Sequence, residues 1–526
     1  MLTRLTLILL IGVTAGVISV SQSQIQRREL TLQEKRGKAF YLRGESASGR
    51  EITAMMGEVD VPATTLTCAG CHGSRGEGRT EGGVTAGSTT WSYLTKPYGH
   101  ADEGGRKHAA FTESSFVRSL TAGLDPAGNK LAVAMPTYRM PQEDMSNLIA
   151  YLKRIETDTD PGLTDNTIVV GTVLPEKTAL HGLAQSIGDV LQAYFAEING
   201  RGGIYNRKIE LRLVYGDAKA TVANAKRLID DDQVFAMVGG LTAGAEDGVA
   251  ALTHEKEVPF VGPSTLLPQR GLPLNRYVFY LLPGLKEQAR ALTLFAAKKT
   301  PPARSRIAIL APDVDFNRSI AATVAEQAEK SRWTSVTTTH YARDQFPASQ
   351  FVTDLQQKGI DTVFLLGSGS EAAALLKAAE RADWTPSFYM LGSLVGRNVA
   401  DSLSPQMKDK VFLAFPTVPS DVSAAGAAEY TSLLQRNKID STHAAAQASA
   451  IAAARILVHA LELCGKDLTR ERLVTALEGL YEYDTGLMPK ITFGPNRRIG
   501  VLGAYVVTID PAKKLFPASV EWVAVE

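Results

Sequence analysis

The stretch Thr67-Cys68-Ala69-Gly70-Cys71-His72-Gly73 decides how the first part of this 526-residue chain is organised. Two cysteines separated by two residues and followed at once by a histidine form the attachment pattern of haem c. Each thiol bonds to one vinyl group of the porphyrin, and the adjacent imidazole binds the iron. The pattern therefore predicts one covalently attached haem c, with Cys68 and Cys71 as the thioether residues and His72 as an axial iron ligand.

Two other uses of a Cys-x-x-Cys pair are disfavoured by its surroundings. The chain has only three cysteines, and the third, Cys464, is far away in sequence, so a four-cysteine zinc cage cannot be built. A thioredoxin-type pair should open a helix after a β-strand, whereas a Pro-containing stretch (61–66) precedes this pair and a Gly-rich stretch (73–78) follows it. Cys464 itself is expected to be a small buried apolar residue.

The composition is that of a soluble globular protein of several domains. Hydrophobic residues make up 44% and charged residues 21%, and the net charge is +1. These values give no reason to expect nucleic acid or an anionic membrane as a partner. The length predicts about three folded units.

The first 24 residues have the pattern of a signal peptide or an N-terminal anchor. Arg4 is followed by the apolar run 5–20, which is short for a membrane-spanning helix, and small residues follow it. Export places the protein in the periplasm, where cytochromes c acquire their haem, so this segment and the haem motif agree.

Residues 25–156 resemble a class I cytochrome c domain, which implies an all-α fold. Helical periodicity is expected over 33–43, over 111–124 with Thr112 as the N-cap, and over the closing segment 142–155. Members of this family often reach the haem motif directly after the first helix. Here residues 44–67 intervene, and they predict an elaborated loop beside the haem.

The stretch Leu131-Ala132-Val133-Ala134-Met135-Pro136-Thr137-Tyr138 is similar to the family's loop that carries the second iron ligand. The resemblance implies that the thioether of Met135 binds the iron opposite the histidine, which raises the reduction potential and suits electron transfer. Met140 is the second candidate. His100 and His108 lie in or beside a polar, Gly-rich stretch and are expected to be surface loop residues.

A new pattern begins after residue 156. Residues 157–166 are acidic, contain proline and glycine, and have no apolar period, so they predict a linker. From residue 167 onward short apolar runs alternate with helical patterns. This alternation predicts βαβ units with parallel sheets, in two doubly wound lobes.

Residues 167–526 resemble the type I periplasmic solute-binding proteins, in particular the branched-chain amino-acid-binding group of ABC importers. The resemblance rests on the order and spacing of several stretches: 197–204, 238–243, 258–265 and 491–498. It implies two lobes that close on a ligand, with crossovers between them near residues 283, 416 and 492.

The resemblance also implies a set of ligand-binding residues. After the strand that ends at Val238, a helix opening at 242–244 would direct its free N–H groups at a carboxylate. Thr242, Ala243, Ser264 and Thr265 are therefore expected to hold a carboxylate, with Phe316 as an apolar wall in the other lobe. The loop 391–396 lacks the carboxylate that binds an α-ammonium group in the amino-acid binders. We therefore expect a small carboxylate, an alcohol-derived compound or an aromatic compound instead of an ordinary α-amino acid.

Two functional hypotheses follow. In the first, the haem exchanges electrons with a periplasmic dehydrogenase or oxidase, while the second body binds a small ligand or docks the redox partner. In the second, the protein is a solute-binding or sensing receptor for an ABC permease, with an auxiliary haem. No nucleophile elbow, phosphate loop or metal cluster is seen in the second body, so enzyme activity is not expected.

Overall fold

The computed structural model describes residues 29–101, 105–176, 180–242, 244–301, 305–343, 345–512 and 515–525. The predicted signal segment therefore lies outside the described residues. The chain divides into two compact units, Met1–Asp158 and Thr159–Glu526, and each is considered by itself.

Unit 1 has a helical framework, as expected from its resemblance to the cytochromes c. Thr31 caps the first helix by a capping box with Glu34, and Thr112 caps the fourth helix by accepting a hydrogen bond from the backbone N–H of Ser115. The pentad of the haem motif forms a helix of its own, which the sequence did not predict. The helices are α1 (Leu32–Arg43), α2 (Cys68–His72), α3 (Trp91–Leu94), α4 (Glu113–Ala122) and α5 (Gln142–Leu152).

The first and last helices of unit 1 cross at very short range. A Cβ atom on Gly37 of α1 would lie 2.0 Å from the carbonyl oxygen of Asn147 in α5. Only a glycine permits this approach, which allows the buried rings of Phe40 and Tyr41 to enter the core of the unit. The crossing thus holds the two ends of unit 1 together.

Short strands supplement these helices. The segment 44–67, expected as an elaborated loop, contains β1 (Thr53–Met56) and β2 (Val59–Pro62), which pair antiparallel. Together with β7 (Thr137–Arg139) they form a small sheet in the order β2-β1-β7. Two further antiparallel pairs are β3 (Arg79–Glu81) with β4 (Val84–Ala86), and β5 (His100–Ala101) with β6 (Lys107–His108).

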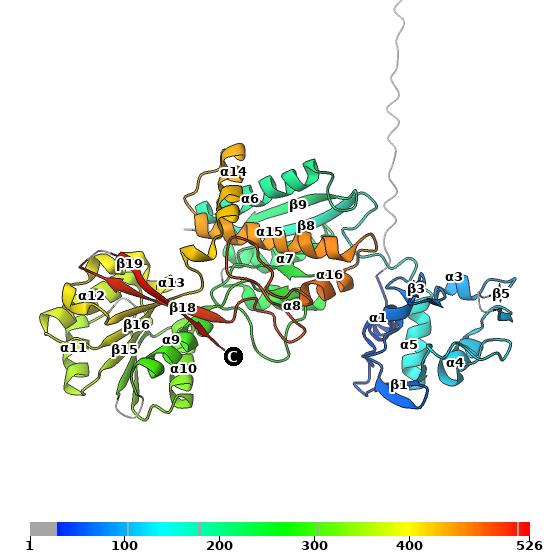
Figure 1. The fold of residues 1–526 in the computed structure, drawn as a ribbon, viewed down its shortest axis with the longest axis horizontal. Helices are drawn as coiled ribbons and strands as arrows, with labels where there is room; N and C mark the ends of the chain where they lie inside the picture. Colours follow the sequence, from blue (N-terminus) through cyan, green and yellow to red (C-terminus); the bar gives the residue numbers. More distant parts are fainter. Residues whose placement is uncertain are drawn as a thin grey trace, which may run out of the picture. The chain divides into compact units, whose positions relative to one another are not determined.

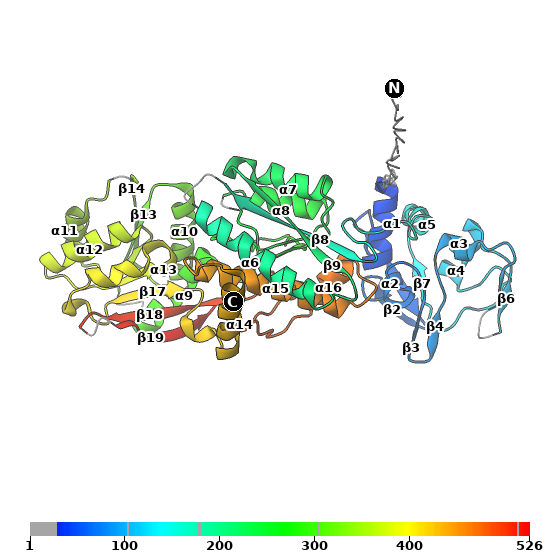
Figure 2. The same cartoon turned by 90° about the horizontal axis from the view of Figure 1, so that it is seen from above.

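Lobe I of unit 2 is a parallel sheet in the order β12-β11-β10-β8-β9. Lobe I is built from segments that are far apart in sequence, because the orange helices α14 to α16 lie beside its cyan and green elements (Figure 2). Its elements are β8 (Thr167–Pro175), α6 (His181–Gly200), β9 (Lys208–Gly216), η1 (Ala218–Ala220), α7 (Thr221–Asp230), β10 (Ala236–Val238), α8 (Glu246–Glu255), β11 (Phe260–Val261), β12 (Val278–Phe279), α14 (Ala424–Asn437), α15 (Ala444–Cys464) and α16 (Arg470–Glu478).

Lobe II has a sheet in the order β14-β13-β15-β16-β17-β18-β19. The first five strands are parallel, and the red strands β18 and β19 add an antiparallel edge (Figure 1). Its elements are α9 (Leu285–Lys299), β13 (Ile307–Pro312), α10 (Asp315–Lys330), β14 (Val336–Tyr341), α11 (Ala348–Gln357), β15 (Thr362–Leu365), α12 (Gly369–Arg381), β16 (Ser387–Leu391), α13 (Gly392–Val395), η3 (Arg397–Ser402), η4 (Pro405–Met407), β17 (Val411–Phe415), η5 (Pro419–Asp421), β18 (Gly503–Asp510) and β19 (Leu515–Ala524). The two doubly wound lobes expected from the sequence are confirmed.

The chain passes between the lobes at three places. The first passage lies between β12 and α9, and the second lies between β17 and α14, close to the predicted positions. The third differs from the prediction near residue 492, because Ile491, Phe493 and Val501 all belong to the core of lobe I. The chain therefore enters lobe II only at β18, which begins at Gly503.

The segment 159–166, predicted as part of a linker, is held by hydrogen bonds within unit 2. The carboxylate of Asp160 accepts from the backbone N–H of Arg470, at 2.7 Å. The carbonyl oxygen of Gly162 accepts from the N–H of Val169, and Leu163 forms a β-bridge with Ile168. These residues therefore form the beginning of lobe I.

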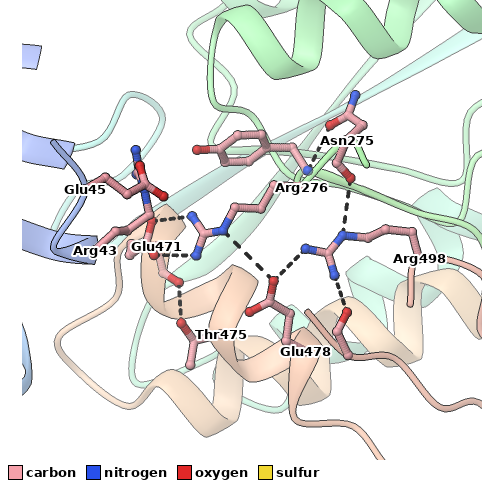
Figure 3. Close-up of polar contacts among 10 residues, drawn as sticks. Arg43, Glu45, Asn275, Arg276, Glu471, Thr475, Glu478 and Arg498 are labelled. Atoms are coloured by element: carbon pink, nitrogen blue, oxygen red, sulfur yellow. Dashed lines mark hydrogen bonds and ion pairs between the residues drawn. The ribbon is translucent and has the colours of Figure 1, made fainter. Parts of the chain in front are cut away.

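A cluster of ion pairs joins three segments of lobe I (Figure 3). The guanidinium of Arg276 binds Glu471 through two hydrogen bonds of 2.7 and 2.5 Å. Arg498, whose side chain is 3% exposed, donates to Glu478 at 2.5 Å and to the carbonyl oxygen of Asn275 at 3.2 Å. The cluster fixes α16 against residues 275–276, which precede the first passage to lobe II, and against Arg498, which precedes the third.

Within the described residues, one helix, α15, is long and apolar enough to cross a bilayer by length and composition. Its most apolar stretch is 61% buried, and residues such as Ile456 and Leu457 belong to the core of lobe I. Cys464 at its end is 3% exposed, as expected for a small buried apolar residue.

Candidate functional site

The haem motif lines a cavity in unit 1. Thr67 starts α2 by accepting a hydrogen bond from the N–H of Gly70, and Gly73 with a φ of 82° ends it. Cys68, Cys71 and His72 stand at positions i, i+3 and i+4 of this turn, which places them on one face. All three line the same cavity.

Both thiols of the motif are unpaired. Burial raises the pKa of Cys68 to about 12, so this sulfur is a protonated thiol at neutral pH. A neutral thiol in an apolar wall is the form from which a thioether to a vinyl group is made. The thiol of Cys68 is therefore suited to covalent attachment to a vinyl group.

His72 is oriented by a single strong hydrogen bond. Its Nδ1 lies 2.7 Å from the carbonyl oxygen of Gly87, and a carbonyl oxygen only accepts, so Nδ1 carries the hydrogen. This leaves Nε2 with its lone pair, the arrangement found for iron-binding histidines. Burial lowers the pKa of His72, which keeps the imidazole neutral and able to bind a metal.

Met135 lines the same cavity, on the segment 131–136. The N–H of Met135 donates to the carbonyl oxygen of Ala132, which forms a turn, and the hydroxyl of Tyr138 donates to the carbonyl oxygen of Leu66 beside the motif. Met140 packs against the core of unit 1 and is not one of the described residues that line the cavity. The geometry favours Met135 over Met140 as the second axial ligand.

His100 and His108 do not lie where the sequence placed them. They were expected as surface loop residues, but they pair with each other across β5 and β6 and line the cavity. Their ring centroids are 5.0 Å apart. The sequence did not predict this pairing, because each histidine is an isolated residue in a polar stretch. The only indication was that both histidines lie between the haem motif and Met135.

The residues of the cavity fit haem c. Two thiols, an imidazole with a free Nε2 and a thioether are the donor set that the group requires, and all four come from residues that line one space. When bound, the group supplies one-electron redox chemistry. In the part of the chain that the structure describes, no group of three or more His, Cys, Asp or Glu side chains is placed to hold a further metal ion.

The expected ligand-binding residues of unit 2 lie at the carboxyl ends of the lobe I strands. Leu241 forms a parallel bridge with Ser264, and the N–H of Ser264 donates to the carbonyl oxygen of Gly240, so the loops after β10 and β11 are adjacent. Thr242 is 3% exposed, and its hydroxyl has no hydrogen-bond partner among the described residues. Ala243 lies outside the described residues.

The helix that was expected to open at 242–244 begins later, with α8 at Glu246. Its first turn carries the carboxylates of Glu246 and Asp247. Thr265 donates its hydroxyl hydrogen to Glu246 at 3.1 Å, and the side-chain amide of Gln269 donates to Asp247 at 2.6 Å. The positive charge at the N-terminus of α8 is therefore already balanced by two carboxylates of the helix itself, those of Glu246 and Asp247.

The remaining predicted residue, Phe316, belongs to lobe II. It is the second residue of α10, is partly buried, and packs against the core that includes Ile309 and Ile320. The loop 391–396 forms α13 and contains no acidic residue. The sequence did not indicate Glu246, because its position depends on where α8 starts, and the Gly-rich loop before the helix does not show this.

Comparison with known proteins supports both units. A family model described as "Periplasmic binding protein" matches residues 167–514, and one described as "Cytochrome c" matches residues 60–156. A curated relative, "Leu/Ile/Val-binding protein homolog 8" of Brucella abortus, is 23% identical over 257 residues. The match covers 46% of this chain and only 62% of the length of that relative.

Solved structures share the fold of unit 2. A fatty acid ABC transporter substrate-binding protein from Thermomonospora curvata has a TM-score of 0.53 and 20% identity, and the match covers 70% of this chain and 95% of that one. A branched-chain amino acid ABC transporter protein from Thermus thermophilus with bound valine has a TM-score of 0.53 and 16% identity, covering 69% and 98%. Because the first family model covers well over half of the sequence, the chain belongs to the periplasmic binding protein family, and a cytochrome c domain precedes its two-lobed body.

Proposed function

We propose that this protein is a periplasmic c-type electron carrier whose binding-protein body recognises a small solute or docks its redox partner. The observation that carries the proposal is the single cavity lined by Cys68, Cys71, His72 and Met135. Cys68 and Cys71 would hold one haem there, and this group would supply the exchange of single electrons with a periplasmic dehydrogenase or oxidase. The protein would be a carrier and not a haem enzyme, because the imidazole of His72 and the thioether of Met135 would both hold the iron.

Exposure to carbon monoxide tests the axial assignment. Reduced haem with two protein ligands does not bind carbon monoxide at neutral pH, whereas haem with an open position does. We expect the absorption spectrum of the reduced wild-type protein to be unchanged by the gas. Rapid formation of a carbon monoxide adduct would contradict ligation by Met135 and reopen the case for an enzyme.

For unit 2 we propose a neutral, hydroxylated solute in place of a carboxylate. Two features of the described residues support this class. The carboxylate of Glu246 already accepts from Thr265 at the first turn of α8, so a second carboxylate there would be repelled. The buried hydroxyl of Thr242 can donate to or accept from an alcohol oxygen.

The solute class is tested with matched pairs of compounds on the purified full-length protein. Ethylene glycol is compared with glycolate, and glycerol with glycerate, by the shift in the unfolding temperature of unit 2. A ligand at a hundred times its Kd stabilises the folded state by about 2.7 kcal/mol. We expect the alcohols to stabilise more than the acids, and the reverse order would restore the carboxylate hypothesis.

The electron-transfer proposal is tested by mixing the oxidised protein with reduced periplasmic dehydrogenases and recording haem reduction, with and without the solute. Rapid reduction by one dehydrogenase supports the carrier role. The alternative is a solute-binding or sensing receptor of an ABC permease with an auxiliary haem, and the family match over residues 167–514 supports it. Tight solute binding with no haem reduction by any partner would favour that receptor.

A further inference from the structure

Unit 2 contains a pocket at the place where the chain passes between its two lobes, which we call the hinge pocket. It holds about 690 Å³, within the range of about 300 to 1,000 Å³ that is common for small-molecule sites. Residues within 420–423 and 481–502 line it, together with Tyr505 of β18 and Trp522 of β19. Of the described residues that line it, none belongs to the loops after β10 and β11, so the pocket is separate from the expected solute site.

The three passages between the lobes contact one another beside this pocket. Tyr505, just after the third passage, donates its hydroxyl hydrogen to Asp421 of the second passage at 2.5 Å. The other oxygen of Asp421 accepts from the backbone N–H of Val418 at 2.8 Å. The N–H of Gly500 donates at 2.8 Å to the carbonyl oxygen of Tyr280, which precedes the first passage. A change in the angle between the lobes therefore changes the shape of the pocket, and a molecule bound there restrains the passages.

Arg497 brings a positive charge to the hinge pocket. Its Nε donates to the carbonyl oxygen of Ile499 at 3.3 Å, and its Nη2 donates to that of Gly500 at 2.9 Å. Burial lowers the pKa of Arg497, and no acidic side chain of the described residues raises it, yet a guanidinium stays protonated at neutral pH. A partly buried guanidinium that is bound only to carbonyl oxygens keeps its charge available for an anion.

The acidic residues of the pocket do not balance this charge. Glu482 faces Lys490, with its Oε2 4.0 Å from the Nζ atom. The carboxylate of Asp484 accepts a hydrogen bond from the backbone N–H of Gly486 at 2.7 Å. In the part of the chain that the structure describes, no carboxylate that lines the pocket forms an ion pair with Arg497. The pocket therefore has one cation that lacks a counter-charge.

Aromatic rings form the other distinctive part of the pocket. Trp522 packs edge-to-face on Tyr505, with ring centroids 4.8 Å apart and an angle of 65° between the rings. Trp522 is nevertheless 40% exposed, and Tyr481 is 77% exposed. Exposed aromatic rings that line a pocket are surfaces on which a planar ring can pack. Together with the unbalanced guanidinium they favour a ligand that has both a flat ring and a negative charge.

We propose that the hinge pocket binds an aromatic carboxylate, with its carboxylate on Arg497 and its ring against Trp522 and Tyr505. The bound molecule contacts both lobes and holds the three passages in one arrangement. The inference goes beyond the proposed function, since it requires neither the haem nor a solute at Thr242.

The first test compares three probes by calorimetric titration of the full-length protein. Benzoate has both the ring and the charge, benzyl alcohol lacks the charge, and cyclohexanecarboxylate lacks the aromatic ring. Benzyl alcohol should bind at least about tenfold more weakly than benzoate, because it forms no charged hydrogen bond with the guanidinium. Cyclohexanecarboxylate should bind about threefold to tenfold more weakly, because a saturated ring gains less from aromatic neighbours.

Matched variants assign the binding to particular side chains. R497Q should weaken benzoate binding about tenfold or more, and R497K should recover part of it. W522L should weaken benzoate binding while leaving the preference for benzoate over benzyl alcohol. R381Q changes an exposed arginine of α12 and should behave as wild type. If R497Q does not fold, the three probes on the wild type and W522L decide the question.

Hydrogen exchange measured by mass spectrometry locates the bound benzoate. Exchange of the backbone amides should slow in residues 280–284, 415–423 and 497–505, which belong to the three passages. Residues 240–242 and 262–266, in the loops of the expected solute site, should be unaffected. T242V should bind benzoate as the wild type does.

Four results would overturn the proposal. They are no binding of benzoate at millimolar concentration, equal affinity for benzoate and benzyl alcohol, full affinity in R497Q, and protection confined to the loops of Thr242 and Ser264. The last result would place the carboxylate in the solute site and would contradict the proposed neutral solute as well. Failure of the first three kinds leaves the proposed functions of the haem cavity and the solute loops unchanged.

Discussion

The cavity of unit 1 and the ligand loops of lobe I were both predicted from sequence, and they differ in how closely the structure matches the expectation. In the cavity, all four predicted haem residues line one space. In lobe I, the loops of Thr242 and Ser264 are adjacent, but the helix expected to receive a carboxylate begins later and carries its own acids. A covalent cofactor requires particular atoms at fixed spacing, whereas a solute cleft tolerates many side chains on the same scaffold.

The largest expected effect is the loss of haem from unit 1 when both motif cysteines are removed. The variant C68A/C71A should yield polypeptide without covalently bound haem, because no thioether can form. The mass of the intact protein and the absorption of the denatured protein measure this. C464A, which removes the buried cysteine of α15, should keep its haem and thereby show that the effect belongs to the cavity.

A second prediction concerns the crossing of α1 and α5. In G37A the new methyl group would lie 2.0 Å from the carbonyl oxygen of Asn147, and backbone cannot move aside as a flexible side chain can. The free energy of unfolding of unit 1 should fall by about 3 kcal/mol. Thermal unfolding followed by haem absorption measures it.

G271A is the control for this glycine, since a Cβ atom at Gly271 meets nothing within 4 Å. Its unfolding temperature should equal that of the wild type. An unchanged stability in G37A would mean that the two helices separate easily and that their crossing does not hold the two ends of unit 1 together.

A third prediction sharpens the choice of axial ligand. M135A should lower the reduction potential and open the iron to carbon monoxide, because the thioether favours ferrous iron and fills the sixth position. M140A should change neither property, since Met140 does not line the cavity among the described residues. If M140A instead lowered the potential and opened the iron to carbon monoxide while M135A did not, Met140 would be the iron ligand.

The smallest expected effect is in the loops of lobe I. T242V removes a buried hydroxyl that lacks a partner among the described residues, so the ligand-free protein should gain about 1 kcal/mol of stability. If the hydroxyl binds the solute, the affinity for the best alcohol of the matched pairs should fall about tenfold. Calorimetric titration measures the affinity, and an unchanged affinity would remove Thr242 from the ligand site.

The sequence predicted most of the framework because periodicity and capping act locally. The helix expected over 142–155 is α5, which begins at Gln142, and Thr112 caps α4 as expected. Passages and pockets depend on contacts between distant segments. The third passage between the lobes was predicted near residue 492, which is too early in the sequence. The sequence does not show that Phe493 packs into the core of lobe I. His100 and His108 were misplaced for the same reason, since only the fold brings them to the cavity.

Residues 159–166 supply contacts on which lobe I depends. The carboxylate of Asp160 binds the backbone N–H of Arg470, which is the first residue of α16, so a residue 310 positions earlier completes the N-terminus of that helix. A receptor fragment cut at residue 167, where the family match begins, would leave this amide and the Gly162 contact to Val169 unsatisfied. Fragments for ligand screening or crystallisation should therefore start at Thr159.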